Sequence, residues 1–147
     1  MERLTKVQWA MALVDVTAKR STCLHRQIGC VLLNAKGHVL ATGYNGAASG
    51  LPHCSDLGFC AKEDVGFTSG QGHDHCVAIH AEQNALMQCR FIDEIDTAYI
   101  SCSPCMTCAK LFLNTGVKAI FYHKQYPDTK ALDMLINRGI QCSQVSI

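Results

Sequence analysis

The sequence predicts an α/β fold in which helices cover a five-stranded mixed sheet. Three observations lead to this prediction: an amphipathic first segment, a hairpin of two apolar runs, and three further strand-like segments, each preceded by a helical one. The predicted order is α, β, β, α, β, α, β, α, β, and the helix between the last two strands should make them parallel. With 147 residues, of which 48% are hydrophobic and 17% charged, the chain suits a single compact domain, 1–147.

The first helix and the hairpin have clear local signals. Thr5 and Gln8 have the spacing of a capping box at the start of a helix. One apolar stripe then follows along that helix: Val7, Met11, Val14 and Ala18. Residues 28–33 and 38–44 are the expected hairpin strands, and the sequence Asn-Ala-Lys-Gly at 34–37 is their turn.

The segment at about 45–76 is rich in glycine and shows no sustained periodicity. A structureless loop of this length is uncommon in a compact domain unless it has a function or a clamp, and its Cys and His residues could provide one. Three later strands are expected, over 97–102, 118–122 and 140–145. A helix over 78–90 precedes the first of them, and a helix from Pro104 to about Gly116, with Ser103 as its N-cap, precedes the second. A last helix, capped by Asp128 or Thr129 and closed by Gly139, precedes the third.

Charge and hydropathy exclude several classes of function. The formal net charge of +1 argues against a polyanion-binding surface, so we expect no nucleic-acid partner. No apolar run approaches the roughly 18 residues of a membrane span, and residues 1–19 lack the apolar core of a signal peptide. We therefore expect a cytoplasmic protein without a membrane partner.

Ten cysteines and seven histidines are many for this length. Disulfides would suit a short secreted chain, whereas thiolates near imidazoles are typical of zinc sites. We therefore predict that some cysteines bind zinc and that others, Cys30, Cys89 and Cys142, are small core residues within apolar runs.

A Cys-x-x-Cys motif at the start of a helix predicts a metal site. Cys105 and Cys108 would share one face of the first turn, where the helix dipole favours thiolates. A redox pair or half of a structural zinc knuckle is the alternative interpretation. His80 opens another helix and would supply a third ligand, which leaves a fourth position for water, as in catalytic zinc sites.

Glu82 follows His80 by two residues and is the candidate for moving protons between that water and the leaving group. As a lone residue it could also be an acidic side chain that favours a helix N-terminus. However, His-x-Glu and Pro-Cys-x-x-Cys occur together here, and the pair is the signature of zinc deaminases. The expected reaction is attack of zinc hydroxide on the amino-bearing carbon of a pyrimidine or purine, with release of ammonia.

With these motifs, nearly the whole chain resembles the deoxycytidylate (dCMP) deaminase family of the cytidine deaminase superfamily. The segments that carry the resemblance are Arg20-Ser-Thr-Cys23, Gly43-Tyr-Asn-Gly46, Gly50-Leu-Pro-His-Cys54, His80-Ala-Glu-Gln-Asn-Ala85, Ser103-Pro-Cys105 with Cys108, and Tyr126-Pro-Asp128. The resemblance implies a three-layer α-β-α fold and the conversion of dCMP to dUMP, a thymidylate precursor.

The resemblance also implies substrate contacts. Asn45 should contact the deoxyribose, and Arg26 and Gln27 are candidates for the 5′-phosphate region. Guanidinium suits phosphate, although an exposed surface arginine is an equal alternative for Arg26. Tyr126 is expected to pack on the base, and a tyrosine buried in the core is the alternative interpretation.

A second, structural zinc is implied by the same resemblance. Its ligands would be Cys23, Cys54, His73 and Cys76, a closed set that would clamp the glycine-rich loop. Cys60 and His75 are possible substitutes, and unligated cysteines in the loop are the alternative.

Assembly and regulation follow from the family as well. Members are often homo-oligomers, with the hexamer favoured, and allosteric members respond to dCTP and dTTP through a segment that corresponds to Gly43, Tyr44, Asn45 and Gly46. The stretch Gln88-Cys-Arg-Phe91 departs from the pattern of such members, so regulation stays open. Two rival hypotheses remain: a deaminase of dCTP, cytidine or tRNA, and a non-catalytic zinc module.

Overall fold

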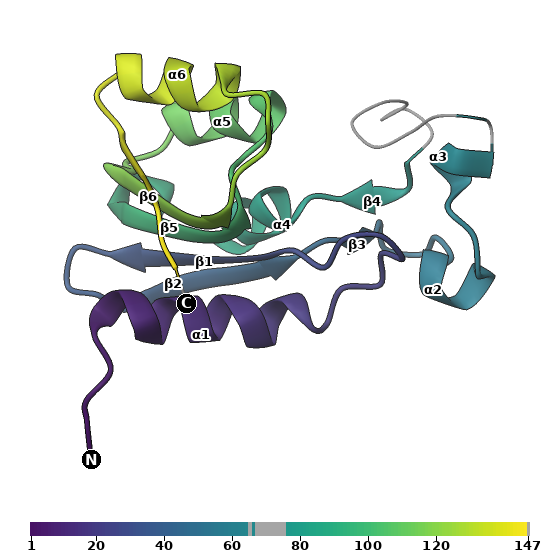
Figure 1. The fold of residues 1–147 in the computed structure, drawn as a ribbon, viewed down its shortest axis with the longest axis horizontal. Coiled ribbons are helices and arrows are strands. Elements are labelled where there is room, and N and C mark those ends of the chain that lie inside the picture. Colours follow the sequence, from purple (N-terminus) through teal and green to yellow (C-terminus); the bar gives the residue numbers. More distant parts are fainter. Residues whose placement is uncertain (65, 67–75, 147) are drawn as a thin grey trace.

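The structure is a computed structural model that describes residues 1–64, 66 and 76–146. Its centre is a five-stranded sheet in the order β2-β1-β5-β6-β7 (Figure 1). The strands are β1 (Gly29–Asn34), β2 (Val39–Tyr44), β5 (Ile95–Cys102), β6 (Ala119–Lys124) and β7 (Gln141–Gln144). β1 is antiparallel to β2 and β5, while β5, β6 and β7 run parallel, so the predicted mixed sheet with a parallel final pair is confirmed.

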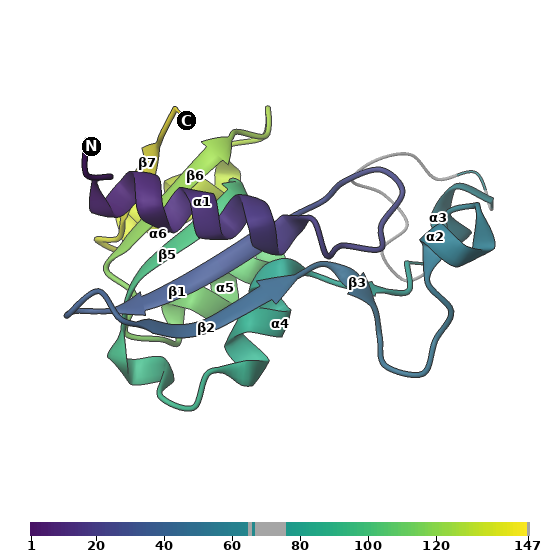
Figure 2. The ribbon, with the colours of Figure 1, turned by 90° about the horizontal axis from the view of Figure 1, so that it is seen from below.

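Helices cover both faces of the sheet. α1 (Lys6–Ala18) lies on one face, and three shorter helices lie on the other (Figures 1 and 2). These are α4 (Ala81–Gln88), α5 (Met106–Leu113) and α6 (Lys130–Asn137). The arrangement confirms the predicted three-layer α-β-α fold.

Strand alternation divides the core into two clusters. Under α1, Val31, Leu33 and Tyr99 of the sheet pack against Met11 and Val14 of the helix. On the opposite face, neighbouring strand residues such as Cys30 and Ile100 pack against α4, α5 and α6. Because successive strand residues point to opposite faces, β1 can be apolar throughout and still serve both clusters.

Local signals fix the beginning of the fold. The Thr5 hydroxyl accepts a hydrogen bond from Gln8 N (3.1 Å), and Gln8 Oε1 accepts one from Thr5 N (2.8 Å), so the capping box is confirmed. In the hairpin turn, Asn34 Oδ1 accepts from His38 N (2.9 Å), and Gly37 has a φ of +82°. The turn therefore uses asparagine and glycine for the reasons that the sequence suggested.

An extension projects beyond one end of the sheet in both views (Figures 1 and 2). It consists of β3 (Gly46–Ala47), α2 (Cys54–Leu57), α3 (Ala61–Asp64) and β4 (Ala78–Ile79). β3 and β4 pair antiparallel, so the loop predicted at about 45–76 contains short elements that were not expected, and the helix predicted from residue 78 begins later. Two-residue strands have no periodicity that a sequence pattern could reveal, and pairing with β3 delays the start of α4 until Ala81.

The N-cap predicted for α5 is wrong. Ser103 does not cap the helix, because its hydroxyl accepts a hydrogen bond from Tyr126 N (2.9 Å) in a distant loop. Cys105 stands at the N-cap position instead, and α5 begins at Met106. A short 3-10 helix, η2 (Ile92–Glu94), precedes β5. Within the described residues, no helix combines the length and apolarity that crossing a bilayer requires.

Candidate metal centre and active site

His80, Cys105 and Cys108 come together although two of them are 28 positions apart. The His80 Nδ1 atom lies 3.5 Å from Cys105 Sγ and 3.3 Å from Cys108 Sγ. In the part of the chain that the structure describes, this is the one group of three or more potential ligands whose donor atoms all lie within 4.8 Å of one another. The predicted convergence of the three side chains is therefore present in the fold.

Two helix starts bring these side chains together. His80 is the N-cap residue of α4, and Cys105 is the N-cap residue of α5. Cys108 is fully buried in the first turn of α5. Both helices lie on the same face of the sheet, so their N-termini can present ligands to one point (Figure 1).

The start of α4 is held by specific contacts. His80 N donates to Gln83 Oε1 (2.9 Å), and Asn84 Nδ2 donates to the carbonyl oxygen of Tyr44 (2.8 Å). At Gly43 a Cβ atom would collide with Ala81 O and with the backbone nitrogen of the next helical turn. The absence of a side chain at Gly43 therefore lets α4 pack directly on β2 and sets the position of His80.

The donor set fits zinc. One imidazole nitrogen and two sulfurs are ligands that Zn²⁺ selects, and tetrahedral coordination at usual bond lengths separates nitrogen and sulfur donors by roughly 3.5 Å. The two nitrogen–sulfur distances in this group agree with that separation. The side chains thus provide three of four tetrahedral positions with little rearrangement.

The thiol pair is electrostatically asymmetric. A hydrogen bond from Cys108 is the main cause that lowers the pKa of Cys105 to about 3, and His80 contributes in the same direction. The same hydrogen bond, with burial, raises the pKa of Cys108. In the absence of a cation the pair therefore holds one thiolate, and a bound cation would compensate the charge of the second.

Glu82 lies beside this group and is only 6% exposed. Burial raises the pKa of its carboxyl to about 7, while a backbone hydrogen bond, the charge of His80 and a hydrogen bond from Cys108 oppose that rise. A carboxyl group with a pKa near neutrality can both accept and release a proton under physiological conditions. The environment therefore suits the proton-transfer role predicted for it.

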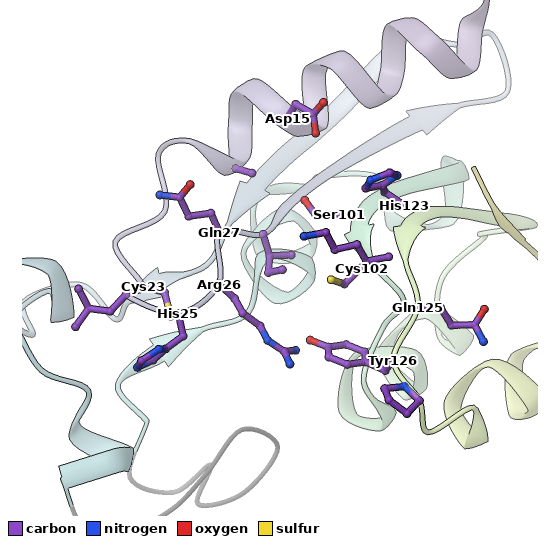
Figure 3. A pocket seen from close by; sticks show the side chains of 15 residues that line it. Asp15, Cys23, His25, Arg26, Gln27, Ser101, Cys102, His123, Gln125 and Tyr126 are labelled. Atoms are coloured by element: carbon purple, nitrogen blue, oxygen red, sulfur yellow. The ribbon is translucent and has the colours of Figure 1, made fainter. Parts of the chain in front are cut away.

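A cavity of about 900 Å³ opens at the edge of the sheet where β1 begins and β5 and β6 end (Figure 3). Its wall includes Arg26, Gln27 and Tyr126, three of the predicted substrate contacts. The guanidinium carbon of Arg26 lies 4.5 Å from the centroid of the Tyr126 ring, and the two side chains point toward one another in Figure 3. Arg26 is therefore engaged at the cavity rather than directed away from it.

The cavity adjoins the metal-ligand group but is not lined by it. The link between them is Cys102, at the end of β5. Burial raises the pKa of the Cys102 thiol, the charge of Arg26 lowers it, and the charge of Glu82 raises it. Cys102 lines the cavity and is near enough to Glu82 for that charge to affect its pKa.

Asn45 organises the loop that carries Arg26. Its Oδ1 accepts from Ile28 N (2.9 Å), and its Nδ2 donates to the carbonyl oxygen of Arg26 (2.9 Å). Asn45 is 9% exposed. The amide thus has a structural task that the sequence did not predict, and its contact with deoxyribose stays a prediction.

The cysteines predicted for a structural zinc gather in and near the extension. Burial raises the pKa of Cys54, and the nearby thiols of Cys60, Cys23 and Cys76 raise it further. No three of these described thiols approach one another as closely as the His80 group does. His73 and the alternative ligand His75 lie outside the described residues.

The segment predicted for effector binding has structural tasks of its own. Gly43 and Tyr44 support α4, as described above, and Gly46 opens β3. The guanidinium carbon of Arg20 lies 5.9 Å from the centroid of the Tyr44 ring. An effector site at these residues stays a prediction.

Three cysteines were predicted as core residues. Cys30 and Cys89 are buried, and Cys142 is half-buried against the same cluster as Cys30. Most other residues of the cavity wall were not predicted as site residues, among them Cys102 and Lys124. These two are register partners at the carboxyl ends of β5 and β6, and the rule that ligands bind at the carboxyl ends of parallel strands could have indicated both.

Comparison with known sequences agrees with this geometry. Residues 4–124 match the model of the cytidine and deoxycytidylate deaminase zinc-binding region. Deoxycytidylate deaminase of Mycobacterium phage D29 is 33% identical over 124 residues, which cover 80% of this chain and 94% of the phage protein. ComE operon protein 2 of Bacillus subtilis is 34% identical over 152 residues, which cover the whole of this chain and 75% of that protein.

A longer relative matches over part of its length. Deoxycytidylate deaminase of Schizosaccharomyces pombe is 34% identical over 137 residues, or 91% of this chain, and the chain spans only 42% of that protein. Among solved structures, dCMP deaminase of cyanophage S-TIM5 in complex with dCMP and dUMP is 26% identical, with a TM-score of 0.74 over 98% of this chain and 100% of that chain. The sequence match and the fold match thus cover largely the same part of this chain.

Proposed function

Because this chain belongs to the cytidine and deoxycytidylate deaminase family, we propose that it catalyses the zinc-dependent hydrolysis of dCMP to dUMP and ammonia. The observation that carries this proposal is the convergence of His80, Cys105 and Cys108 beside the buried carboxyl of Glu82. Three protein ligands leave one zinc coordination position for a reactant, which distinguishes a catalytic site from a closed structural one.

Each side chain has a defined task in this reaction. His80, Cys105 and Cys108 hold the zinc ion, which when bound supplies a Lewis acid that makes water reactive near neutral pH. Glu82 takes a proton from the attacking water and delivers it to the amino nitrogen, so that a carbon–oxygen bond forms, the carbon–nitrogen bond breaks and ammonia leaves. Burial of the Glu82 carboxyl raises its pKa, which favours its holding a proton between the two transfers.

The cavity supplies the substrate-binding side of the proposal. Arg26 and Gln27 contact the 5′-phosphate region, and Tyr126, from the same cavity wall, packs on the base. Asn45 contacts the deoxyribose and holds the Arg26 loop at the same time. A planar guanidinium binds phosphate through two parallel hydrogen bonds. Contact with the Tyr126 ring keeps the guanidinium of Arg26 at the cavity.

Replacing Glu82 by Gln tests the catalytic part. The amide keeps the size of the side chain but cannot cycle a proton, so ammonia release from dCMP should fall by at least about a hundredfold. Zinc content and the melting temperature should stay near those of the wild type. Glu94→Gln, at an exposed carboxylate of η2, is the matched control. Full activity of Glu82→Gln would support a non-catalytic zinc module instead.

A substrate panel tests the specificity. Ammonia release is measured side by side from dCMP, dCTP, cytidine and an adenosine-bearing RNA hairpin at equal concentrations. The proposal expects dCMP to have the highest kcat/KM. Turnover of the RNA hairpin alone would contradict it.

A second, structural zinc belongs to the same proposal. Cys23, Cys54 and Cys76 would bind it together with His73, and the effect of the nearby thiols of Cys60, Cys23 and Cys76 on the pKa of Cys54 supports their proximity. Metal analysis should therefore find about two zinc ions per chain. Cys54→Ser should lose one of them and keep the one at His80, whereas a wild-type content of one zinc would contradict the structural site.

Assembly and regulation complete the proposal. The enzyme is a homo-oligomer, with a hexamer as the favoured form, and it works in the cytoplasm on pyrimidine nucleotides that lead to thymidylate. Sedimentation with and without dCTP or dTTP measures the assembly, and initial rates under the same conditions measure allosteric regulation.

A further inference from the structure

The cavity has a second cationic side chain to which neither the motifs nor the family resemblance assigns a role. Lys124 is the last residue of β6 and lines the cavity that Arg26 also lines. Ser103 N donates to its carbonyl oxygen (2.7 Å), so its backbone is fixed at this position. Its side chain is exposed at the cavity rim and available for a ligand.

Strand order explains why Lys124 and Arg26 belong to one site. Arg26 lies just before β1 and Lys124 ends β6, and β5 runs between these two strands. β1 is antiparallel to β5 and β6 is parallel to it, so the start of β1 and the ends of β5 and β6 meet at the same edge. Two strand spacings amount to roughly 10 Å, a distance that long cationic side chains can bridge through one anion.

Cys102 lies between the two cations. It is the register partner of Lys124, and the positive charges of Arg26 and Lys124 both lower the pKa of its thiol. The charge of Glu82 acts on the same thiol in the opposite direction. Arg26 and Lys124 line the cavity together with Cys102, whereas Glu82 does not line it.

The charge balance at the cavity favours an anion. Among the described residues that line it, Asp15 has the only carboxylate, against the two permanent cations Arg26 and Lys124. Figure 3 places Asp15 on α1, apart from the facing pair Arg26 and Tyr126. A dianionic phosphate would therefore enter a positive environment.

We propose that Lys124 is a phosphate-binding residue that works with Arg26 and makes this enzyme selective for nucleoside 5′-monophosphates over nucleosides. The inference rests on the proposed function, because it takes the base of the same nucleotide to lie at Glu82. In this arrangement the base enters past Cys102, while the 5′-phosphate stays in the cavity between β1 and β6. Lys124 is a binding residue and takes no part in proton transfer.

The test compares four variants at residues that the proton-transfer step does not use. Lys124→Gln should raise the KM for dCMP roughly tenfold with kcat unchanged, since it removes one charged hydrogen bond to phosphate. Lys124→Arg should restore most of the affinity, and Asp15→Asn should lower the KM. Lys118→Gln, at an exposed lysine just before the other end of β6, is the matched control and should behave as wild type.

A second measurement separates this inference from the proposed function. The dissociation constants of dCMP and of inorganic phosphate are measured by calorimetry on the zinc-loaded proteins, without any need for turnover. Weaker binding of both ligands by Lys124→Gln supports the inference, even if dCMP proves not to be the substrate. Equal affinities in wild type and Lys124→Gln, or a fall in kcat without a change in KM, would overturn it.

Discussion

At the scale of single residues, side chains that motif comparison assigns to the substrate also hold the protein together. Asn45 is the clearest case, because both ends of its amide bind backbone groups of the loop that carries Arg26. Arg26 in turn rests on Tyr126. The proposed recognition of the nucleotide would therefore depend on the same side chains that order the loop.

This dependence leads to a prediction for Asn45→Ala. The substitution leaves Ile28 N without its side-chain partner and Arg26 O with only the longer hydrogen bond from Ser21 Oγ (3.4 Å). This loss in a largely buried position should lower the free energy of unfolding by about 2 kcal/mol. The KM for dCMP should rise in parallel because the Arg26 loop loses its anchor. Urea denaturation and steady-state kinetics measure the two effects, with exposed Asn137→Ala as control. A raised KM with unchanged stability would indicate a substrate contact alone.

At the scale of elements, the site depends on how closely α4 approaches the sheet. Gly43 leaves room for the backbone of α4. The carbonyl oxygen of Tyr44 accepts a hydrogen bond from Asn84 Nδ2, in the first turn of α4. The helix that carries His80 and Glu82 is thus positioned by β2, a strand that contributes none of the three candidate ligands.

Gly43→Ala should therefore act through α4. Its Cβ would overlap backbone atoms of Ala81 and Ala85, which cannot rotate away, so α4 must shift. We expect a loss of about 1–3 kcal/mol in the free energy of unfolding, as for overpacked cores, together with weaker zinc binding. Thermal melts and titration with a competing chelator measure these effects. Thr42→Ala, the exposed neighbour in β2, should change neither, and unaltered zinc affinity in Gly43→Ala would refute the coupling.

The sequence predicted the elements where their signals were local or periodic. The capping box at Thr5 and the turn at Asn34 followed from short-range chemistry, and the apolar strands followed from composition. Ser103 was predicted wrongly because Tyr126, 23 positions away, uses its hydroxyl. The pairing of β3 with β4 was missed for the same reason: it depends on a contact between residues more than 30 positions apart.

At the scale of the whole molecule, the candidate site combines parts from both halves of the chain. His80, Cys105 and Cys108 were predicted because their spacing forms a motif, and the fold confirms that they meet. Lys124 and Cys102 were missed because their proximity is created by the parallel register of β5 and β6. Motifs in the sequence predict which chemistry a site can perform. The residues that form the wall of a cavity also depend on strand order and register, which these motifs do not contain.

Metal removal should therefore affect the molecule as a whole. Zinc bound at the starts of α4 and α5 ties the two helices together, and a ligand that binds only the folded state stabilises it by mass action. Treatment with a chelator should lower the melting temperature by about 5–10 °C.

Two variants sharpen this measurement. Cys108→Ser should melt near the chelated wild type and respond little to chelator. Cys142→Ser, at a half-buried cysteine away from the metal group, should keep the full chelator response. An identical melting temperature of the wild type with and without chelator would contradict a structural contribution of the metal.

The three candidate ligands come from the starts of two separate helices, and this also affects when the folding protein can bind metal. The donors meet only after α4 and α5 have both docked on the same face of the sheet, with β5 laid down between them in the chain. In the unfolded chain Cys105 and Cys108 are close in sequence, whereas His80 reaches them only when both helices have docked. Stable metal binding would thus report that docking, and a zinc-responsive dye could time it during refolding.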